Sequence, residues 1–213
     1  KPFSPKKVRP CVFEYIYFSR PDSILTGKTA YEYRKNYGAQ LAIEDDLEAD
    51  IVVPVPDSGN AAALGYAQEK NIPFELGLIR NHYVGRTFIE PSQKIRSLGV
   101  KLKLNANLSV IKDKKIILID DSLVRGTTSH KIVKMIYSAG AKEVHVRIAS
   151  PEIKYPDFYG VDMPTKKELL ASDKSIKEIC DFINAKSLKY LTIDGLYKAM
   201  GFDKRNNTYP QLT

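Results

Sequence analysis

The residues with the clearest chemical potential lie together in one short segment. A four-residue apolar run, Ile116–Ile119, leads into the acids Asp120 and Asp121, and a Gly/Thr/Thr/Ser turn follows at residues 126–129. The glycine of that turn permits close backbone approach. The three residues after it would supply hydroxyl groups and amides at a helix N-terminus, where a phosphate is favoured. The segment therefore predicts a phosphate-binding site.

The two acids need a different task, because carboxylates repel a phosphate directly. Hydrogen-bonding to two ribose hydroxyls suits them, and so does engaging Mg²⁺ near the ligand. The alternative is an aspartate pair that only caps the following helix. One aspartate would fit that alternative, but two acids beside a hydroxyl-rich anion site are poorly explained by it. We therefore favour a ligand site.

The elements that must position this segment are predicted from hydrophobic periodicity. Apolar or alternating runs predict strands at residues 12–18, 51–55, 74–79, 116–119 and 144–148. Helical spacing is found at residues 29–43, 61–70 and 132–139. Alternating strands and helices predict an α/β fold with an open parallel sheet covered by helices, whose ligands bind at the carboxyl ends of strands. Residues 81–107 show no period and are expected to form a functional or disordered loop.

The pattern changes after Pro151. Thr165–Glu168 and Ser175–Glu178 each fit a capping box that opens a short helix, and Leu196–Met200 is a third helical stretch. These elements predict a small C-terminal helical lobe. We accordingly expect a linker, an α/β core that contains the phosphate-binding segment, the lobe and a frayed tail at residues 1–10, 11–150, 151–205 and 206–213.

Composition limits the partners. The net charge of +8 suits nucleic acid, an anionic small molecule or simply a solvated basic surface, and the last is favoured because the lysines are scattered and no helix-turn-helix or zinc-finger pattern occurs. No apolar run approaches the roughly 20 residues that cross a bilayer. The two cysteines, Cys11 and Cys180, suit a reducing compartment. We expect a cytoplasmic protein that binds neither nucleic acid nor membrane.

The segment Asp120-Asp-Ser-Leu-Val-Arg-Gly-Thr-Thr-Ser129 resembles the phosphoribosyl-pyrophosphate loop of type I phosphoribosyltransferases. Among these enzymes, its sequence is most similar to that of the amidophosphoribosyltransferase family. Further stretches resemble the same family at residues 13–23, 81–89, 103–106 and 150–162. The resemblance implies the type I phosphoribosyltransferase fold with the C-terminal lobe over the site.

The resemblance also implies an activity. Ammonia would replace the pyrophosphate of 5-phosphoribosyl-1-pyrophosphate with Mg²⁺ as cofactor, giving 5-phosphoribosylamine, the first step of de novo purine biosynthesis. In the family, glutamine hydrolysis belongs to an N-terminal glutaminase domain, so residues 1–10 would be a linker from that missing domain and glutamine would act only through it. A homo-oligomer (dimer or tetramer) and inhibition by purine nucleotides are implied as well. A purine-salvage phosphoribosyltransferase and a phosphoribosyl-pyrophosphate-sensing repressor remain the alternatives.

The family roles carry over to matching positions in this chain. The implied substrate-binding residues are Asp57, Ser58, Gly59, Arg80, Asn81, Asp120, Asp121, Ser122, Arg125, Gly126, Thr127, Thr128 and Ser129. Catalytic roles fall to Tyr83, Arg86, Thr87, Asp120 and Asp121, of which the first three match the family's mobile loop. Ser58 and both aspartates would hold Mg²⁺. The alternatives are a helix N-cap for Ser58 and an idle surface loop around Arg86.

The chain departs from the family in two places. Where the family's loop usually begins Lys-Asn-Arg-Tyr, this chain has Arg80-Asn-His-Tyr83, and His82 would be largely neutral at pH 7. Members with an iron–sulfur cluster place one cysteine ligand at the position of Cys11 and another at that of Asp157. Because one thiolate cannot hold such a cluster, we expect no cluster and a structural role for Cys11.

Overall fold

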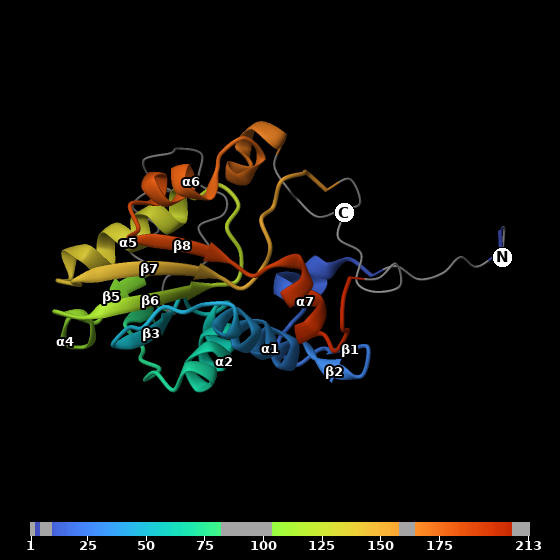
Figure 1. Cartoon of the computed structure of the whole chain (residues 1–213), viewed down its shortest axis with the longest axis horizontal. Helices are drawn as coiled ribbons and strands as arrows, with labels where there is room; N and C mark the ends of the chain where they lie inside the picture. The colour runs from blue at the N-terminus through green and yellow to red at the C-terminus, as the bar shows by residue number, and fades with distance from the viewer. Residues whose placement is uncertain (1–2, 5–9, 82–103, 158–164, 206–213) are drawn as a thin grey trace.

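A four-stranded parallel sheet forms the centre of the computed structural model, which describes residues 3–4, 10–81, 104–157 and 165–205 (Figure 1). In spatial order its strands are β3 (Ile51–Pro54), β6 (Lys115–Asp120), β7 (Glu143–Ile148) and β8 (Ser187–Tyr190). All neighbouring pairs are parallel, so the carboxyl ends of the four strands lie at one edge. The predicted α/β class with an open parallel sheet is confirmed.

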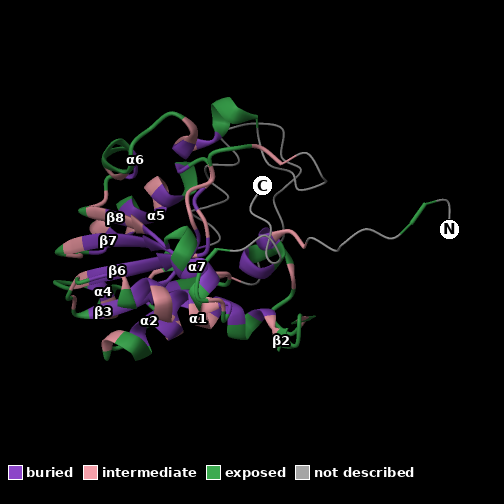
Figure 2. Cartoon of the chain, turned by 45° about the vertical axis from the view of Figure 1, so that its right-hand side comes forward, coloured by how far each residue is buried: buried purple, intermediate pink, exposed green. Residues whose placement is uncertain are grey.

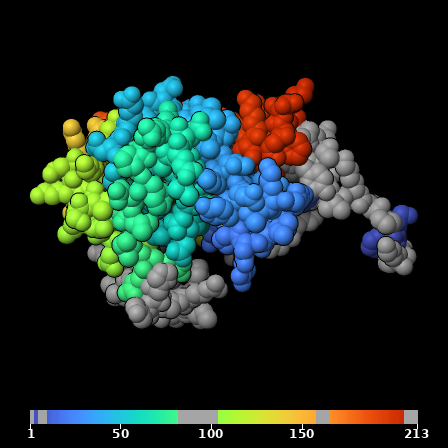
Figure 3. Space-filling view, turned by 90° about the horizontal axis from the view of Figure 1, so that it is seen from below, coloured from blue at the N-terminus to red at the C-terminus, as the bar shows by residue number. Residues whose placement is uncertain are grey.

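Helices cover both faces of this sheet (Figures 1 and 2). One face carries α1 (Ala30–Ile43), α2 (Asn60–Lys70) and, beside them, α7 (Ile193–Ala199), and the other carries α5 (Thr127–Ser138) and α6 (Ile176–Ile183). The view from below shows α1 and α2, in blue to teal, covering the first face (Figure 3). None of the helices in the described ranges is long and apolar enough to cross a membrane.

Alternate residues of β6 enter opposite hydrophobic cores. Ile116 and Leu118 pack in the cluster that contains α5 and α6, whereas Ile117 and Ile119 pack in the cluster of α1 and α2. All four side chains are at most 1% exposed. A strand buried on both faces has to be continuously apolar, which explains why the run 116–119 lacks alternation.

The helices α1 and α2 approach so closely that glycine is required at their contact. A Cβ on Gly38 would lie 1.8 Å from the carbonyl oxygen of Ala62, and one on Gly65 would lie 1.9 Å from that of Lys35. Gly38 interrupts the helical pattern of residues 29–43, yet α1 continues through it. The loss of helix propensity at this glycine is therefore offset by backbone-to-backbone packing.

Two antiparallel pairs lie outside the main sheet. They are β1 (Ile24–Leu25) with β2 (Lys28–Thr29), and β4 (Leu78–Arg80) with β5 (Leu104–Ala106), after which the short helix α4 spans Leu108–Ile111. The predicted strand 74–79 is confirmed only in part, because Phe74 forms a single bridge with Val52 and the strand itself begins at Leu78. The strand β5 ends the stretch that we expected to be one continuous loop.

The predicted strand at residues 12–18 is wrong, because this segment is helical. It contains the π-helix η1 (Glu14–Phe18), and its buried side chains, including Val12, Tyr15 and Ile16, follow helical spacing. Side-chain hydrogen bonds from Arg34 to the carbonyl groups of Tyr15 (3.1 Å) and Ser19 (2.6 Å) hold the segment on α1. Tertiary contacts therefore override the high strand propensity of these aromatic and β-branched residues.

The chain after Pro151 contributes more than helices. The strand β8, which the sequence analysis did not predict, extends the main sheet. The capping box at Ser175 is confirmed at the start of α6, but Thr165 opens only a 3-10 turn, η2 (Lys166–Glu168), which is followed by η3 (Leu170–Ser172). The third expected helix is α7, which begins at Ile193, with Thr192 as its N-cap.

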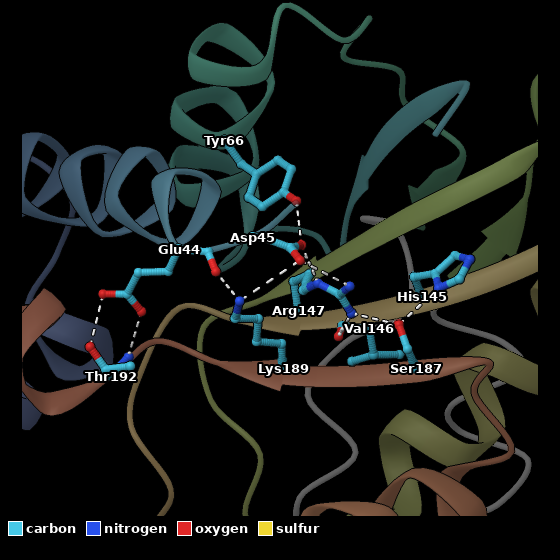
Figure 4. Close-up of polar contacts among 9 residues, drawn as sticks. All are labelled: Glu44, Asp45, Tyr66, His145, Val146, Arg147, Ser187, Lys189 and Thr192. Atoms are coloured by element: carbon cyan, nitrogen blue, oxygen red, sulfur yellow. Dashed lines mark hydrogen bonds and ion pairs between the residues drawn. The ribbon is translucent and has the colours of Figure 1, made fainter. Parts of the chain in front are cut away.

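A buried polar network joins the end of α1 to β7 and β8 (Figure 4). The guanidinium of Arg147 donates to Asp45 at 2.5 Å, and the Tyr66 hydroxyl donates to the same carboxylate at 2.6 Å. Arg147 also donates to the Ser187 hydroxyl at 2.9 Å, which in turn lies 2.8 Å from Nδ1 of His145. These contacts tie α1 and α2 to β7 and the added strand β8.

Candidate functional site

The aspartate pair lies where β6 ends, at the carboxyl edge of the sheet. The Asp120 carboxylate accepts a hydrogen bond from the Asp121 amide at 2.9 Å, and the Asp121 carboxylate accepts one from the Ser122 hydroxyl at 2.5 Å. Asp121 is only 6% exposed. The backbone carbonyl of Asp120 accepts a hydrogen bond from the Ala149 amide at 2.9 Å, which fixes the end of β6 against the segment after β7.

Burial raises the pKa of both carboxyl groups. The negative charge of Asp121 raises the pKa of Asp120 further. For Asp121, hydrogen bonds from Ser122 and Ser58 and then the positive charge of Arg34 act in the opposite direction, although burial prevails. Two adjacent carboxyl groups that lose solvation and repel each other would be stabilised in their charged form by a nearby cation.

The loop after β3 meets this pair. The Val55 amide donates to the Ile119 carbonyl at 2.8 Å, and the Gly59 amide donates to the Val55 carbonyl at 2.9 Å. A Cβ on Gly59 would lie 2.6 Å from the Ile119 carbonyl oxygen, so only glycine fits beside the end of β6. The loop in turn brings Ser58 to the Asp121 carboxylate. The predicted metal residues, Ser58 with the two aspartates, therefore lie together.

Two predicted substrate-binding residues, Asp57 and Arg80, pair with each other beside this loop. Arg80, at the end of β4, forms an ion pair with Asp57, and both side chains are about half exposed. The following residue, Asn81, is partly buried. The ion pair links β4 to the loop after β3. Local sequence pattern cannot predict it, because the partners lie 23 positions apart.

The predicted phosphate turn opens α5 as expected. Leu123 is 2% exposed and anchors the loop in the core, while Gly126 is the N-cap of α5 with a φ of 70°. Thr127 and Thr128 are exposed at the first turn of the helix, and Ser129 is buried. Exposed hydroxyl groups and amides at the N-terminus of a 12-residue helix form a favourable environment for an anion.

The structure adds Arg34 to this site. Its side chain is 6% exposed, and its positive charge acts on Asp121 from α1. A signal was present in the sequence, because Arg34 shares the helical spacing of Ala30, Tyr37 and Leu41 and therefore belongs on the buried face. A buried arginine requires partners, which the backbone carbonyls of Tyr15 and Ser19 provide.

The predicted catalytic residues Tyr83, Arg86 and Thr87, together with His82, lie outside the described residues, so their roles stay predictions. Cys11 and Asp157 line one cavity of about 620 Å³. Among the described residues no group of three or more His, Cys, Asp or Glu side chains could hold a metal ion. The expectation of no iron–sulfur cluster remains a prediction.

Comparisons with known proteins identify the family. No family model matches the chain. The amidophosphoribosyltransferase of Rhizobium etli is 57% identical over 214 residues, which cover 100% of this chain and 43% of that protein. The Bacillus subtilis amidophosphoribosyltransferase is 53% identical over 191 residues, 90% of this chain and 40% of that protein. The chain belongs to the amidophosphoribosyltransferase family.

Solved structures of this family agree. The Bacillus subtilis glutamine phosphoribosylpyrophosphate amidotransferase complexed with ADP and GMP matches with a TM-score of 0.84 and 51% identity, over 94% of this chain and 44% of that one. An allosteric regulatory enzyme of purine biosynthesis matches with the same TM-score and identity. The expected type I phosphoribosyltransferase fold is confirmed. The chain spans less than half the length of these relatives.

Proposed function

We propose that this chain binds 5-phosphoribosyl-1-pyrophosphate with Mg²⁺ and replaces the pyrophosphate with ammonia, giving 5-phosphoribosylamine in de novo purine biosynthesis. The observation that carries the proposal is the meeting of Asp120 and Asp121 with Ser58 at the sheet edge from which the Gly126–Ser129 turn opens α5. The similarity to amidophosphoribosyltransferases supports this function over a salvage enzyme or a repressor.

Each part of the substrate has a counterpart among these residues. The amides and hydroxyl groups at the start of α5 would hold the 5-phosphate, and the Arg125 guanidinium would add a charge-assisted contact. Asp120 and Asp121 would accept hydrogen bonds from the ribose hydroxyls. The loop at Asp57–Gly59 would face the pyrophosphate, with Arg80 and Asn81 beside it. Positioning is the main requirement, since pyrophosphate is already a good leaving group.

The residues present fit Mg²⁺. Two carboxylates and the Ser58 hydroxyl offer the hard oxygen ligands that this ion prefers, and Mg²⁺ usually completes its shell with substrate phosphates and water. A Mg²⁺ site of this kind needs few acidic ligands from the protein, and the described residues contain no group of three or more potential His, Cys, Asp or Glu ligands. When bound, the ion would offset the negative charge on the departing pyrophosphate.

The chemical step requires little acid catalysis from the protein. Loss of pyrophosphate from C1 gives the sugar oxocarbenium character, so the site has to hold the two ends of the substrate in place while ammonia attacks. We further propose that Arg86 neutralises the leaving pyrophosphate, and that Tyr83 and Thr87 close the site against water with it. Glutamine would serve only through a separate glutaminase domain.

Regulation and assembly are also proposals. Purine nucleotides would bind and inhibit this protein, which is supported by the related Bacillus subtilis structure with ADP and GMP. A dimer or tetramer and a cytoplasmic location rest on the family resemblance alone. Light scattering during gel filtration would test the oligomeric state, and cell fractionation would test the location.

The experiment that tests the function is calorimetric titration with the sugar pyrophosphate, with and without Mg²⁺, followed by a pyrophosphate-release assay with ammonium or adenine. We expect Mg²⁺-dependent binding and release on adding ammonium. Asp120→Asn should weaken binding, whereas the matched change Asp22→Asn, at an exposed aspartate paired with Arg20, should not. Release only with adenine would indicate salvage instead, and binding of duplex DNA in a shift assay would indicate a repressor.

A further inference from the structure

The loop that leads into the predicted phosphate turn, at residues 124–126, contacts a segment that is distant in sequence. The Leu170 amide donates a hydrogen bond to the Val124 carbonyl at 2.9 Å. The next loop residue, Arg125, donates through Nε to the Glu168 carboxylate at 3.3 Å. Two consecutive loop residues are thus bonded to the η2–η3 segment, although about 45 positions of chain separate them.

Packing at Gly126 continues this contact. A Cβ on Gly126 would lie 2.5 Å from Cδ2 of Leu170 and 3.1 Å from the ring of Phe182, so the loop backbone rests directly on these two side chains. In the first turn of α5, Nδ1 of His130 donates to the Phe182 carbonyl at 2.9 Å. Residues 124, 125, 126 and 130 therefore all contact the segment between Glu168 and Phe182.

The Glu168 contact can be read in two opposite ways. The hydrogen bond from Nε of Arg125 to Glu168 uses one of the five guanidinium donors, so four N–H groups remain for an anion. A carboxylate in this place would orient Arg125 toward the ligand, or it would compete with the ligand phosphate for the same cation. The Thr165 hydroxyl, which donates to the second Glu168 oxygen at 3.4 Å, favours orientation because it fixes the carboxylate itself.

We propose that Glu168 and Leu170 are positioning residues for the substrate. They hold Val124, Arg125 and Gly126 in the conformation that receives the sugar phosphate, so less loop entropy is lost when the ligand binds. The inference rests on the proposed function for the identity of the ligand. The contacts between the loop and the segment do not depend on it.

The test uses two pairs of variants and two readouts. Glu168→Ala removes the acceptor, whereas Glu168→Gln keeps an acceptor oxygen without the charge. Leu170→Ala removes the packing at Gly126, whereas Leu170→Met conserves most of its volume. Hydrogen exchange of amides 123–129 reports loop order without ligand, and titration with the sugar pyrophosphate and Mg²⁺ reports affinity. Asp22→Ala breaks a comparable exposed pair elsewhere and serves as the control.

We expect faster exchange of the loop amides in both alanine variants, with little change in the amides of β6. Substrate affinity should fall about two- to fivefold in Glu168→Ala, the size typical of an exposed ion pair, and at least as much in Leu170→Ala. The Gln and Met variants should recover most of the loss. In the ammonia reaction KM should rise with kcat less affected, because the chemical groups are untouched.

Three results would overturn the proposal: loop exchange unchanged in both alanine variants, tighter substrate binding in Glu168→Ala, or equally faster exchange in the loop and in β6. Tighter binding would identify Glu168 as a competitor of the phosphate. A wild-type protein that binds no sugar pyrophosphate would refute the proposed function, and loop exchange would then decide the positioning role by itself.

Discussion

Replacing Gly59 with alanine tests the close approach on which the site depends. The φ of Gly59 is −76°, which alanine adopts without strain, so the only effect is the added methyl group. Its Cβ would lie 2.6 Å from the carbonyl oxygen of Ile119 and 2.9 Å from that of Val55. Both oxygens already accept backbone hydrogen bonds, at 2.8 and 2.9 Å, so neither can move aside freely.

The size of the effect follows from this overlap. Ordinary contact begins near 3.4 Å, so the loop has to move by roughly 0.8 Å. Overpacking of this kind costs about 1–3 kcal/mol, and a misplacement of about 1 Å at a site can cost on the order of 100-fold in rate. The shift would separate Ser58 from Asp121. If the whole of this free energy is lost from substrate binding, we expect the dissociation constant to rise about 5- to 150-fold.

Calorimetry with the sugar pyrophosphate and Mg²⁺ measures the binding loss, and denaturant titration without ligand measures stability. Gly77→Ala is the matched control, because the nearest atoms to its Cβ belong to side chains and not to the backbone, namely Val53 at 2.9 Å and Ile111 at 3.4 Å. That variant should lose stability but keep its affinity. Wild-type affinity in Gly59→Ala, or an equal loss of affinity in Gly77→Ala, would refute the reasoning.

Three further predictions concern the rest of the fold. Asp45→Asn leaves the buried Arg147 without its carboxylate, so the free energy of unfolding should fall by about 3–5 kcal/mol in a denaturant titration, and Asp45→Asn with Arg147→Met should recover part of it. Burial lowers the pKa of His145, so below about pH 6.5 the unfolded state binds more protons than the folded state. The free energy of unfolding should therefore fall by up to about 1.4 kcal/mol for each unit of decreasing pH, and denaturant titrations of His145→Gln should show a flatter slope. Gly38→Ala sets a methyl group 1.8 Å from the Ala62 carbonyl oxygen and should lower the melting temperature by more than about 4 °C.

The main sheet was predictable where both faces of a strand are buried. The strands β3 and β6 lie between helices, so their runs are continuously apolar and stand out from their surroundings. The strand β8 was missed because only Leu188 and Tyr190 of its four residues are buried. A four-residue strand with two polar positions carries too little pattern to separate it from a turn.

Aromatic residues misled the prediction at the start of the chain. In η1, alternating Tyr15, Tyr17 and their neighbours have high strand propensity. The helical form is favoured by burial of one face and by Arg34, whose side chain holds two backbone carbonyls from a different element. Such a contact joins residues that are 15 and 19 positions apart, so local pattern cannot report it.

The same division between local and distant contacts applies to the site. The aspartate pair and the Gly126–Ser129 turn lie close together in the sequence, so a single motif was enough to predict their chemistry. Burial and the neighbouring Ser122 act most on the pKa of Asp121, but residues from elsewhere also act on it, namely Ser58 from the loop after β3 and Arg34 from α1. These residues converge because β3 pairs directly with β6 in parallel, which brings the loop after one strand to the acids after the other. Any sheet order that separated β3 from β6 would keep the motif intact and lose the site. The function proposed for the motif therefore depends on a topology that the motif itself does not encode.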